Sequence, residues 1–316
     1  MMTKSSLIAL FVLVFMGFFP LFVDSAWLAI GTTFLVFSVV ALSQDIILGR
    51  AGVFHMGHAM FFGMGAYTTA ILNVNFGLPI LATLLPAIIV PMVFAFILVA
   101  PIIHLRGDYL LVATIGFNII FIQVLQNDVF GLTGGPNGLF GIDVVKLFGF
   151  ELSSQTHMYY MAFLLLGVTL LIIRNLDRSK FGRAMFYIHK DEIAAQSMGI
   201  NIRYFKLYAF ILGAGIAGAA GSMFSIQYSA VSPEAFNVTQ SIMFFTIVLV
   251  GGSASLPGVL IGTFIMFVLP EMFREFETAR YLVFGIAMIL TMILRPRGIW
   301  PVKFGTIPDF LKKEVK

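Results

Sequence analysis

Two histidines are the residues of this chain best suited to chemistry. His55 and His58 are three residues apart, a spacing that would place both imidazoles on one face of a helix. A transition-metal site needs a third or fourth ligand, and no Asp, Glu or Cys lies between Gly52 and Ala100. We therefore expect no metal, no cofactor and no catalytic residue. Two alternatives stay open: the pair packs among glycines such as Gly57, or it lines a path across a membrane.

Asn118 and Gln123 are the next polar side chains in apolar surroundings, and the same two alternatives, packing or path lining, apply to them. Few ionisable groups otherwise occur in the apolar segments, and Asp45 lies close to the end of one of them. A proton-coupled transporter would be expected to embed a relay of Asp, Glu or His. The sequence contains no Gly-Lys-Ser/Thr of a phosphate-binding loop, so the energy for uphill transport must come from another subunit or an ion gradient.

Apolar blocks must position these residues. The 316-residue chain is 59% hydrophobic and 11% charged, with a mean hydropathy of +1.00, whereas soluble domains are roughly 45–50% apolar and about 25% charged. Since about 20 helical residues cross a bilayer, we predict an all-α polytopic membrane protein, with residues 1–316 in a single domain of about ten transmembrane or re-entrant helices. These are 7–23, 26–47, 52–72, 79–103, 109–126, 157–173, 207–229, 240–250, 257–273 and 281–294.

The third, eighth and ninth of these segments are short or interrupted by glycine. Such segments are typical of broken or re-entrant helices that line a cavity, where other protein groups satisfy the exposed backbone. The first segment, 7–23, exceeds the roughly 7–15 apolar residues of a signal peptide, so we expect it to be retained as a span. The sequence contains no cysteine, which excludes disulfides and thiolate chemistry.

The positive residues predict the orientation. With the N-terminus inside, only Lys146, Arg274 and Arg280 of the nineteen Lys and Arg face outward, and both the loop 174–206 and the tail 295–316 are cytoplasmic. Asp and Glu divide almost evenly, so the asymmetry lies in Lys and Arg, as the positive-inside rule describes. We therefore expect both termini in the cytoplasm. Positive charge distributed by membrane side, rather than in one patch, indicates no nucleic-acid binding.

The predicted external loop, 127–156, is long for a connection between two helices. It contains Thr133, Gly134, Gly135 and Asn137 in the run Thr-Gly-Gly-Pro-Asn-Gly, in which the glycines and the proline favour a tight turn with positive φ angles. Two alternatives stay open for this run. It is a plain connecting turn, or it is a lid or docking surface at the external mouth, since long loops are often functional.

The predicted cytoplasmic loop, 174–206, contains signals for a short helix of about two turns. They are an acidic start, a small apolar face and a terminating glycine: Asp191 and Glu192, then Ala194, Ala195 and Met198, then Gly199. Two alternatives stay open here as well. The helix lies on the anionic leaflet of the membrane lipid, or it docks into a cytoplasmic partner, with the alanines permitting close approach.

Five separated stretches carry a family pattern. They are GVFHMGHAMFFGMGAYTTAIL at 52–72, LRGDYLLVAT at 105–114 with TGGPNG at 133–138, FGRAMFYIHKDEIAAQSMGI at 181–200, GGSASLPGVLIG at 251–262 and RPRGIW at 295–300. In these stretches the chain resembles the permease subunits of branched-chain amino acid ABC importers, the LivM-like family. All five occur in the family's order and extend over most of the chain from the second predicted span onward, which makes the resemblance specific.

The resemblance implies a multi-pass permease in the plasma (inner) membrane of a bacterium or archaeon. It implies four kinds of partner around it: a second homologous permease subunit, two cytoplasmic ATPase subunits, an external or periplasmic substrate-binding protein, and membrane lipid. It also implies that Asp191–Gly199 is the coupling helix, seated in a groove of an ATPase, and that Thr133–Gly138 contacts the binding protein. The family commonly has a small hydroxyl residue at the position of His55, so no role for this histidine follows from the resemblance.

We therefore predict a transport subunit, not an enzyme, that forms half of the translocation path for branched-chain amino acids and leaves ATP hydrolysis to its partners. A permease for urea or another small solute is the first alternative, because related permeases carry such solutes. A self-sufficient secondary transporter or channel is the second. The third is a membrane-embedded enzyme, for which the histidine pair is the only conceivable centre.

Overall fold

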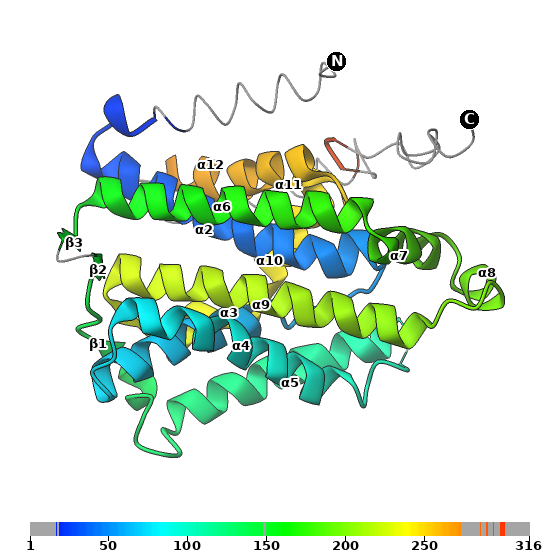
Figure 1. The fold of residues 1–316 in the computed structure, drawn as a ribbon, viewed down its shortest axis with the longest axis horizontal. Coiled ribbons are helices and arrows are strands. Elements are labelled where there is room, and N and C mark those ends of the chain that lie inside the picture. Colours follow the sequence, from blue (N-terminus) through cyan, green and yellow to red (C-terminus); the bar gives the residue numbers. More distant parts are fainter. Residues whose placement is uncertain are drawn as a thin grey trace.

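The computed structural model describes residues 17, 19–105, 107–147, 150–272, 285, 289, 293 and 298–300. Long helices run side by side, and short elements lie at both ends of the bundle (Figure 1). The long helices are α2 (Ser25–Asp45), α4 (Ile80–Val99), α5 (Asp108–Gln126), α6 (Gln155–Arg178) and α9 (Ile202–Tyr228). The shorter ones are α3 (His58–Ala70), α7 (Lys180–Lys190), α8 (Glu192–Ser197), α10 (Val238–Gly251), α11 (Leu256–Thr263) and α12 (Leu269–Met272). There are 3-10 turns at Phe19–Leu21, Gly135–Asn137 and Pro233–Phe236. There are π turns at Ile46–Arg50, Ile71–Asn75 and Phe264–Val268.

Six helices within the described residues are long and apolar enough to cross a membrane. Five of them are α2, α4, α5, α6 and α9, which correspond to the predicted spans 26–47, 79–103, 109–126, 157–173 and 207–229. The sixth, Pro233–Gly251, joins a 3-10 turn to α10 and contains the predicted span 240–250. The predicted spans 7–23 and 281–294 lie mostly outside the described residues. A mostly helical protein with several membrane-crossing helices is therefore confirmed, and the count of ten stays a prediction.

The third predicted span is wrong in its first third. Helix α3 begins at His58 rather than at Gly52, because Gly52 adopts a left-handed φ of +69° and the chain follows an irregular path after it. The amide of Met56 donates to the Thr114 hydroxyl of α5 at 3.2 Å, so a side chain satisfies backbone that a helix would have paired. The prediction that both histidines share one helical face is also wrong, since His55 precedes the helix and His58 opens it.

Glycines allow α3, α4 and α9 to pack closely. A Cβ atom at Gly65 would lie 2.1 Å from the carbonyl oxygen of Gly218, and a Cβ atom at Gly218 would lie 2.2 Å from that of Ala87. Three backbones approach this closely only where side chains are missing. As a result α9 is the most enclosed of the six long helices, with 78% of its apolar stretch buried, against 28% for α4 and 22% for α5.

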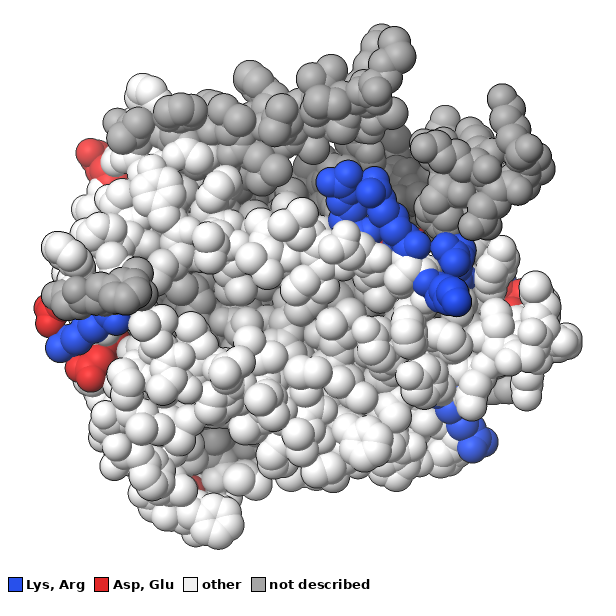
Figure 2. All heavy atoms as spheres, in the orientation of Figure 1, with Lys and Arg blue, Asp and Glu red and all other residues white. Residues whose placement is uncertain are grey.

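The two ends of the bundle differ in structure and in charge. One end, which we call the strand end, has two antiparallel strand pairs: β1 (Leu139–Phe140) with β4 (Ala230–Val231), and β2 (Val145–Leu147) with β3 (Phe150–Leu152). Among the described residues, these short strands differ from the predicted all-α fold. Helices α7 and α8 lie at the opposite end, which we call the basic end (Figure 1). Figure 2 shows several Lys and Arg side chains at the basic end and a broad uncharged band between the two ends.

Candidate functional site

The two histidines belong to a buried chain of hydrogen bonds. Gln44 Nε2 lies 3.2 Å from His55 Nδ1, His55 Nε2 lies 3.3 Å from His58 Nδ1, and His58 Nε2 lies 2.7 Å from Ser43 Oγ. All four residues have no exposed surface. We call Ser43, Gln44, His55 and His58 the histidine cluster. Within the described part of the chain, no three His, Cys, Asp or Glu side chains group as metal ligands.

Hydrogen-bond direction assigns the protons of the histidine cluster. The Ser43 hydroxyl donates to the carbonyl oxygen of Val40 at 2.7 Å, so it accepts from His58 Nε2. His58 Nδ1 then accepts from His55 Nε2, and His55 Nδ1 accepts from the Gln44 amide, which also donates to the His55 carbonyl oxygen at 3.1 Å. Both imidazoles are therefore neutral. The chain of hydrogen bonds ends on the carbonyl oxygen of Val40, which accepts a hydrogen bond but cannot take up a proton and pass it on. The arrangement therefore supports polar packing rather than proton transfer.

A second set of buried hydrogen bonds joins α3, α5 and α10. The amide of Ala59, at the start of α3, donates to Ser241 Oγ at 3.0 Å, and Ser241 donates to Asn118 Oδ1 at 2.8 Å. The Asn118 amide in turn donates to the carbonyl oxygen of Phe236 at 3.0 Å. Helix α3 therefore begins inside the protein, and side chains of α10 and α5 satisfy the backbone at its start and at Phe236, just before α10.

The structure brings together four of the five predicted path residues. His55, His58 and Asn118 are fully buried, and Gly57 lies against α5, where a Cβ atom would be 2.5 Å from the Thr114 carbonyl oxygen. Gln123 lies apart from them. It is exposed near the strand end of α5, and its amide reaches Gln126 at 3.5 Å. In this conformation the four neighbours are enclosed rather than arranged around an open channel.

An ion cluster at the basic end, in which Asp45 and Arg50 are buried and Asp177 is partly exposed, was missed by sequence reasoning. The Arg50 guanidinium donates to Asp45 and, through two nitrogens, to both carboxylate oxygens of Asp177 at 2.7 and 3.1 Å. The other Asp45 oxygen accepts from the Ala254 amide at 2.7 Å. We call Asp45, Arg50 and Asp177 the arginine cluster. It ties the end of α2 to α6 and to the turn before α11. The five-residue spacing of Asp45 and Arg50 was the available signal, but Arg50 was interpreted only as an orienting charge.

Two sequence motifs meet beside the arginine cluster. The amides of Ile299 and Trp300 donate to the carbonyl oxygens of Val250 and Gly251 at 2.9 and 3.0 Å. Gly298 has a φ of +84°, and its Cα lies so close to α10 that a Cβ atom would be 2.3 Å from the Cα of Gly252. Residues 298–300, the described part of the RPRGIW stretch, therefore pack against the start of the GGSASLPGVLIG stretch, although more than thirty residues separate the two stretches in the sequence.

Helix α8 forms as its sequence signals predict. The Asp191 carboxylate accepts from the amides of Ile193 and Ala194 at 2.9 and 3.0 Å, which caps the first turn. Gly199 has a φ of +81°, and the amide after it donates back to Ala195 at 3.1 Å, which closes the last turn. The predicted short helix, with its acidic start and its glycine stop, is confirmed.

The predicted apolar face of α8 is only partly correct. Ala195 is buried, because the helix packs on α7 and α9 through this position. Ala194 and Met198 are exposed, and Ile193, which was not predicted, is exposed at 72%. The outward apolar face therefore consists of Ile193, Ala194 and Met198. Of the two alanines expected on the contact face, Ala195 packs inward and only Ala194 faces outward.

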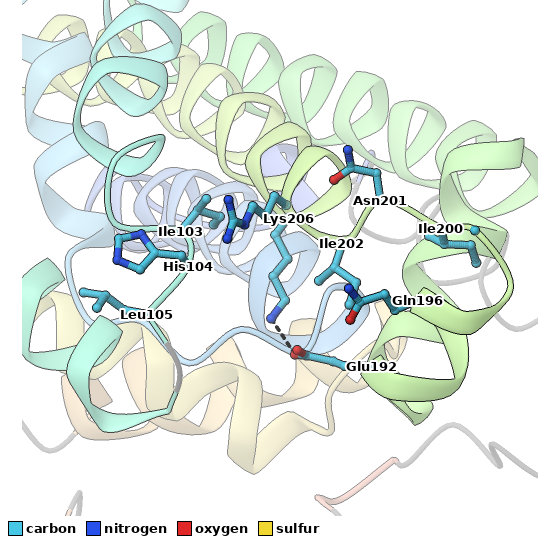
Figure 3. Close-up of a pocket in the computed structure, with 11 residues that line it drawn as sticks. Ile103, His104, Leu105, Glu192, Gln196, Ile200, Asn201, Ile202 and Lys206 are labelled. Atoms are coloured by element: carbon cyan, nitrogen blue, oxygen red, sulfur yellow. Dashed lines mark hydrogen bonds and ion pairs between the residues drawn. The ribbon is translucent and has the colours of Figure 1, made fainter.

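Glu192 points back toward the bundle rather than outward. Its carboxylate forms an ion pair with Lys206 Nζ, a residue of α9 that is 7% exposed (Figure 3). The pair joins α8 to the most enclosed helix of the bundle. The sequence indicated only that Glu192, at the start of the helix, interacts favourably with the helix dipole. Its partner Lys206, fourteen residues further along the chain, was not predicted.

At the strand end, the Thr-Gly-Gly-Pro-Asn-Gly run forms an ordered turn. The Thr133 amide donates to the Asp128 carboxylate at 2.7 Å, and this bond, followed by that of the Thr133 hydroxyl, lowers the pKa of Asp128. Gly134 and Gly135 have φ angles of +73° and +61°, as the turn prediction requires. Gly135 is buried, whereas Gly134 and Asn137 are exposed. Of the four residues predicted to contact the binding protein, only Gly134 and Asn137 are exposed.

Comparison with known proteins identifies the family. The family model described as branched-chain amino acid transport system, permease component, matches residues 27–292. The chain is 33% identical to the high-affinity branched-chain amino acid transport system permease protein LivM of Salmonella typhimurium and to that of Escherichia coli K12, over 95% of this chain and 76% of each relative. It is 24% identical to the probable LivM protein of Methanocaldococcus jannaschii, over 89% of this chain and 94% of the relative. No solved structure matches the chain. The chain therefore belongs to the permease-component family of branched-chain amino acid transport systems.

Proposed function

We propose that this chain is the membrane permease subunit of an ATP-driven importer for branched-chain amino acids in the plasma membrane of a bacterium or archaeon. Its basic end faces the cytoplasm, as the positive-inside rule requires. The observation that carries the proposal is helix α8, a capped helix beyond the end of the bundle with Ile193 and Met198 exposed at 72% and 69%. The relatives named for branched-chain amino acid transport support the substrate class.

Helix α8 is the proposed coupling helix. Its outward face of Ile193, Ala194 and Met198 suits a groove in a cytoplasmic ATPase, because apolar side chains on a small rigid helix provide buried contact area. The Glu192–Lys206 ion pair attaches the helix to α9. When nucleotide binding closes the ATPase pair, a displacement of α8 would therefore move α9 and, through the glycine contacts, α3 as well.

The translocation path is proposed to follow the breaks at the start of α3 and α10. His55, Gly57, His58 and Asn118 surround these breaks and are enclosed in this conformation. A relative movement of α5 would separate the Gly57 contact and the Asn118–Ser241 hydrogen bond, because both link α5 to the two short helices. Gln123, exposed on α5, is the outermost candidate.

Four partners complete the proposed importer: a second homologous permease subunit, two ATPase subunits and an external substrate-binding protein. Gly134 and Asn137 are the exposed residues of the strand-end turn that we propose for contact with the binding protein. Thr133 and Gly135 would hold the turn in shape, through the Asp128 bond and a positive φ respectively.

Reconstitution tests the proposed function. The chain, its partner permease and the two ATPases are placed in liposomes with ATP inside, and the binding protein and radiolabelled leucine are added outside. We expect leucine uptake that requires both ATP and the binding protein. Uptake by the single chain, driven by an ion gradient without ATPases, would overturn the proposal. Uptake of urea in preference to leucine would retain the importer and change its substrate.

A further inference from the structure

A cavity of about 480 Å³ opens at the basic end, between the turn after α4, helix α8 and the start of α9. Figure 3 shows His104 and Leu105 on one side of it, Gln196 on the other and Lys206 between them. Apolar side chains such as Ile103, Leu105 and Ile202 form part of the lining. The cavity therefore presents both apolar and polar groups, and its Glu192–Lys206 ion pair is the one that attaches α8 to α9.

The cavity carries excess positive charge. Two cationic side chains, Arg203 and Lys206, line it together with the carboxylate of Glu192. Lys206 is nearly buried and pairs with Glu192, whereas Arg203 is exposed and forms no ion pair among the described residues. The first amides of the 27-residue helix α9, at Ile202 and Arg203, precede the first intrahelical bonds and add partial positive charge. These groups together favour an anion.

The cavity also lies at the depth of a membrane surface. It is formed where α4 ends and α9 begins, and both helices are long and apolar enough to cross a membrane. Tyr204 and Tyr109, in the first turns of α9 and α5, are exposed at 54% and 77%, and exposed tyrosines are typical of the boundary between membrane and water. Exposed Phe96 and Ile97 on the last turn of α4 continue the apolar surface toward the bilayer.

We propose that this cavity binds the phosphate headgroup of an anionic phospholipid from the adjacent leaflet. Arg203 and Lys206 would donate to the phosphate, and Ile103, Leu105 and Ile202 would contact the glycerol and the first acyl carbons. Basic cavities between membrane helices bind acidic headgroups in this way, and the apolar part of the lining favours a lipid over a soluble phosphate. The site requires only that α4 and α9 cross a membrane, whichever side the basic end faces.

Lipid binding to the assembled transporter tests the site. The complex is stripped of lipid in neutral detergent and titrated with dioleoyl phosphatidylglycerol or dioleoyl phosphatidylcholine, and bound lipid is counted by native mass spectrometry. We expect phosphatidylglycerol to bind in preference. Arg203→Gln should weaken its binding about fivefold, since a basic residue near the surface is worth about 1 kcal/mol. Lys180→Gln, which removes the same charge from α7 outside the cavity, should leave the affinity unchanged.

Several results would overturn the proposal. Equal weakening by Arg203→Gln and Lys180→Gln would mean attraction to the basic end in general. Equal binding of phosphatidylcholine would exclude recognition of an anionic headgroup. Displacement of phosphatidylglycerol by equimolar glycerol 3-phosphate would indicate a soluble anion. Binding to the two permeases alone that is lost in the complete complex would indicate that an ATPase side chain, rather than a lipid, occupies the cavity.

Discussion

Helix α8 and the histidine cluster both interrupt an apolar sequence, but they are stabilised in different ways. The residues of α8 shape it locally: Asp191 caps its first turn, and Gly199 ends it. The histidine cluster depends on tertiary contacts, because His55 and His58 are held by side chains of α2. A locally specified surface helix therefore leaves its outward side chains available for a partner. A buried polar cluster leaves none available, so changes there should affect folding first.

The largest effect should come from Arg50→Met in the arginine cluster. The substitution leaves the buried Asp45 carboxylate and Asp177 without their counter-ion, and breaking a buried pair in this way costs about 3–5 kcal/mol. We expect a large fall in the thermal unfolding temperature and in the amount of protein recovered from membranes. Arg174→Met, at an exposed position of α6, is the matched control and should change the free energy of unfolding by less than about 0.5 kcal/mol. Equal losses in the two variants would mean that the ion pairs of Arg50 contribute no more to stability than an exposed arginine does.

His58→Ala should have the next largest effect. It removes a fully buried ring and the hydrogen bonds that this ring makes with Ser43 Oγ and His55 Nε2, at a cost of about 2–3 kcal/mol. Thermal unfolding of the purified complex measures the loss. His104→Ala, at an exposed position of the basic end, provides the control and should be close to wild type. A stable His58→Ala protein that has lost only uptake would instead favour a direct role in the path.

Gly199→Val should have a smaller effect on stability and a clear effect on coupling. A β-branched residue at a φ of +81° costs about 1–2 kcal/mol, all of it at the end of α8. The protein should still insert, while ATP hydrolysis continues with reduced uptake. Glu192→Lys, which places a like charge beside Lys206, should act in the same direction. Gly167→Val, in an open position on α6, controls for the added side chain. Unchanged uptake in both α8 variants would count against the coupling role.

The long helices were predictable because apolar length alone specifies them. Predicted spans such as 79–103 and 109–126 differ from α4 and α5 by only a few residues. The start of α3 was not predictable in this way, since residues 52–57 are as apolar as the helix that follows. What moves its start to His58 is tertiary: the left-handed Gly52, and the hydrogen bond from Met56 to α5. Propensity and hydropathy contain no information about such partners.

In the candidate site, too, features set by neighbouring residues were predictable, and features set by tertiary contacts were not. The caps of α8 and the positive φ angles near Gly134 were readable because a few neighbouring residues determine them. The outward position of Ile193 and the inward position of Ala195 were not readable, because they depend on how the helix packs on α7 and α9. The Glu192–Lys206 pair and the arginine cluster likewise join segments that the sequence separates.

The affinity of the ATPase for an Ile193→Asp variant tests whether α8 is the coupling helix. A charge in the centre of the outward face of α8 should weaken ATPase binding at least tenfold, a loss of about 1.4 kcal/mol or more. The unfolding temperature should stay at the wild-type value, because the side chain is 72% exposed. Tyr187→Asp, at an exposed position of α7, should bind the ATPase normally. Wild-type affinity of the Ile193→Asp variant would contradict the assignment of α8 as the coupling helix.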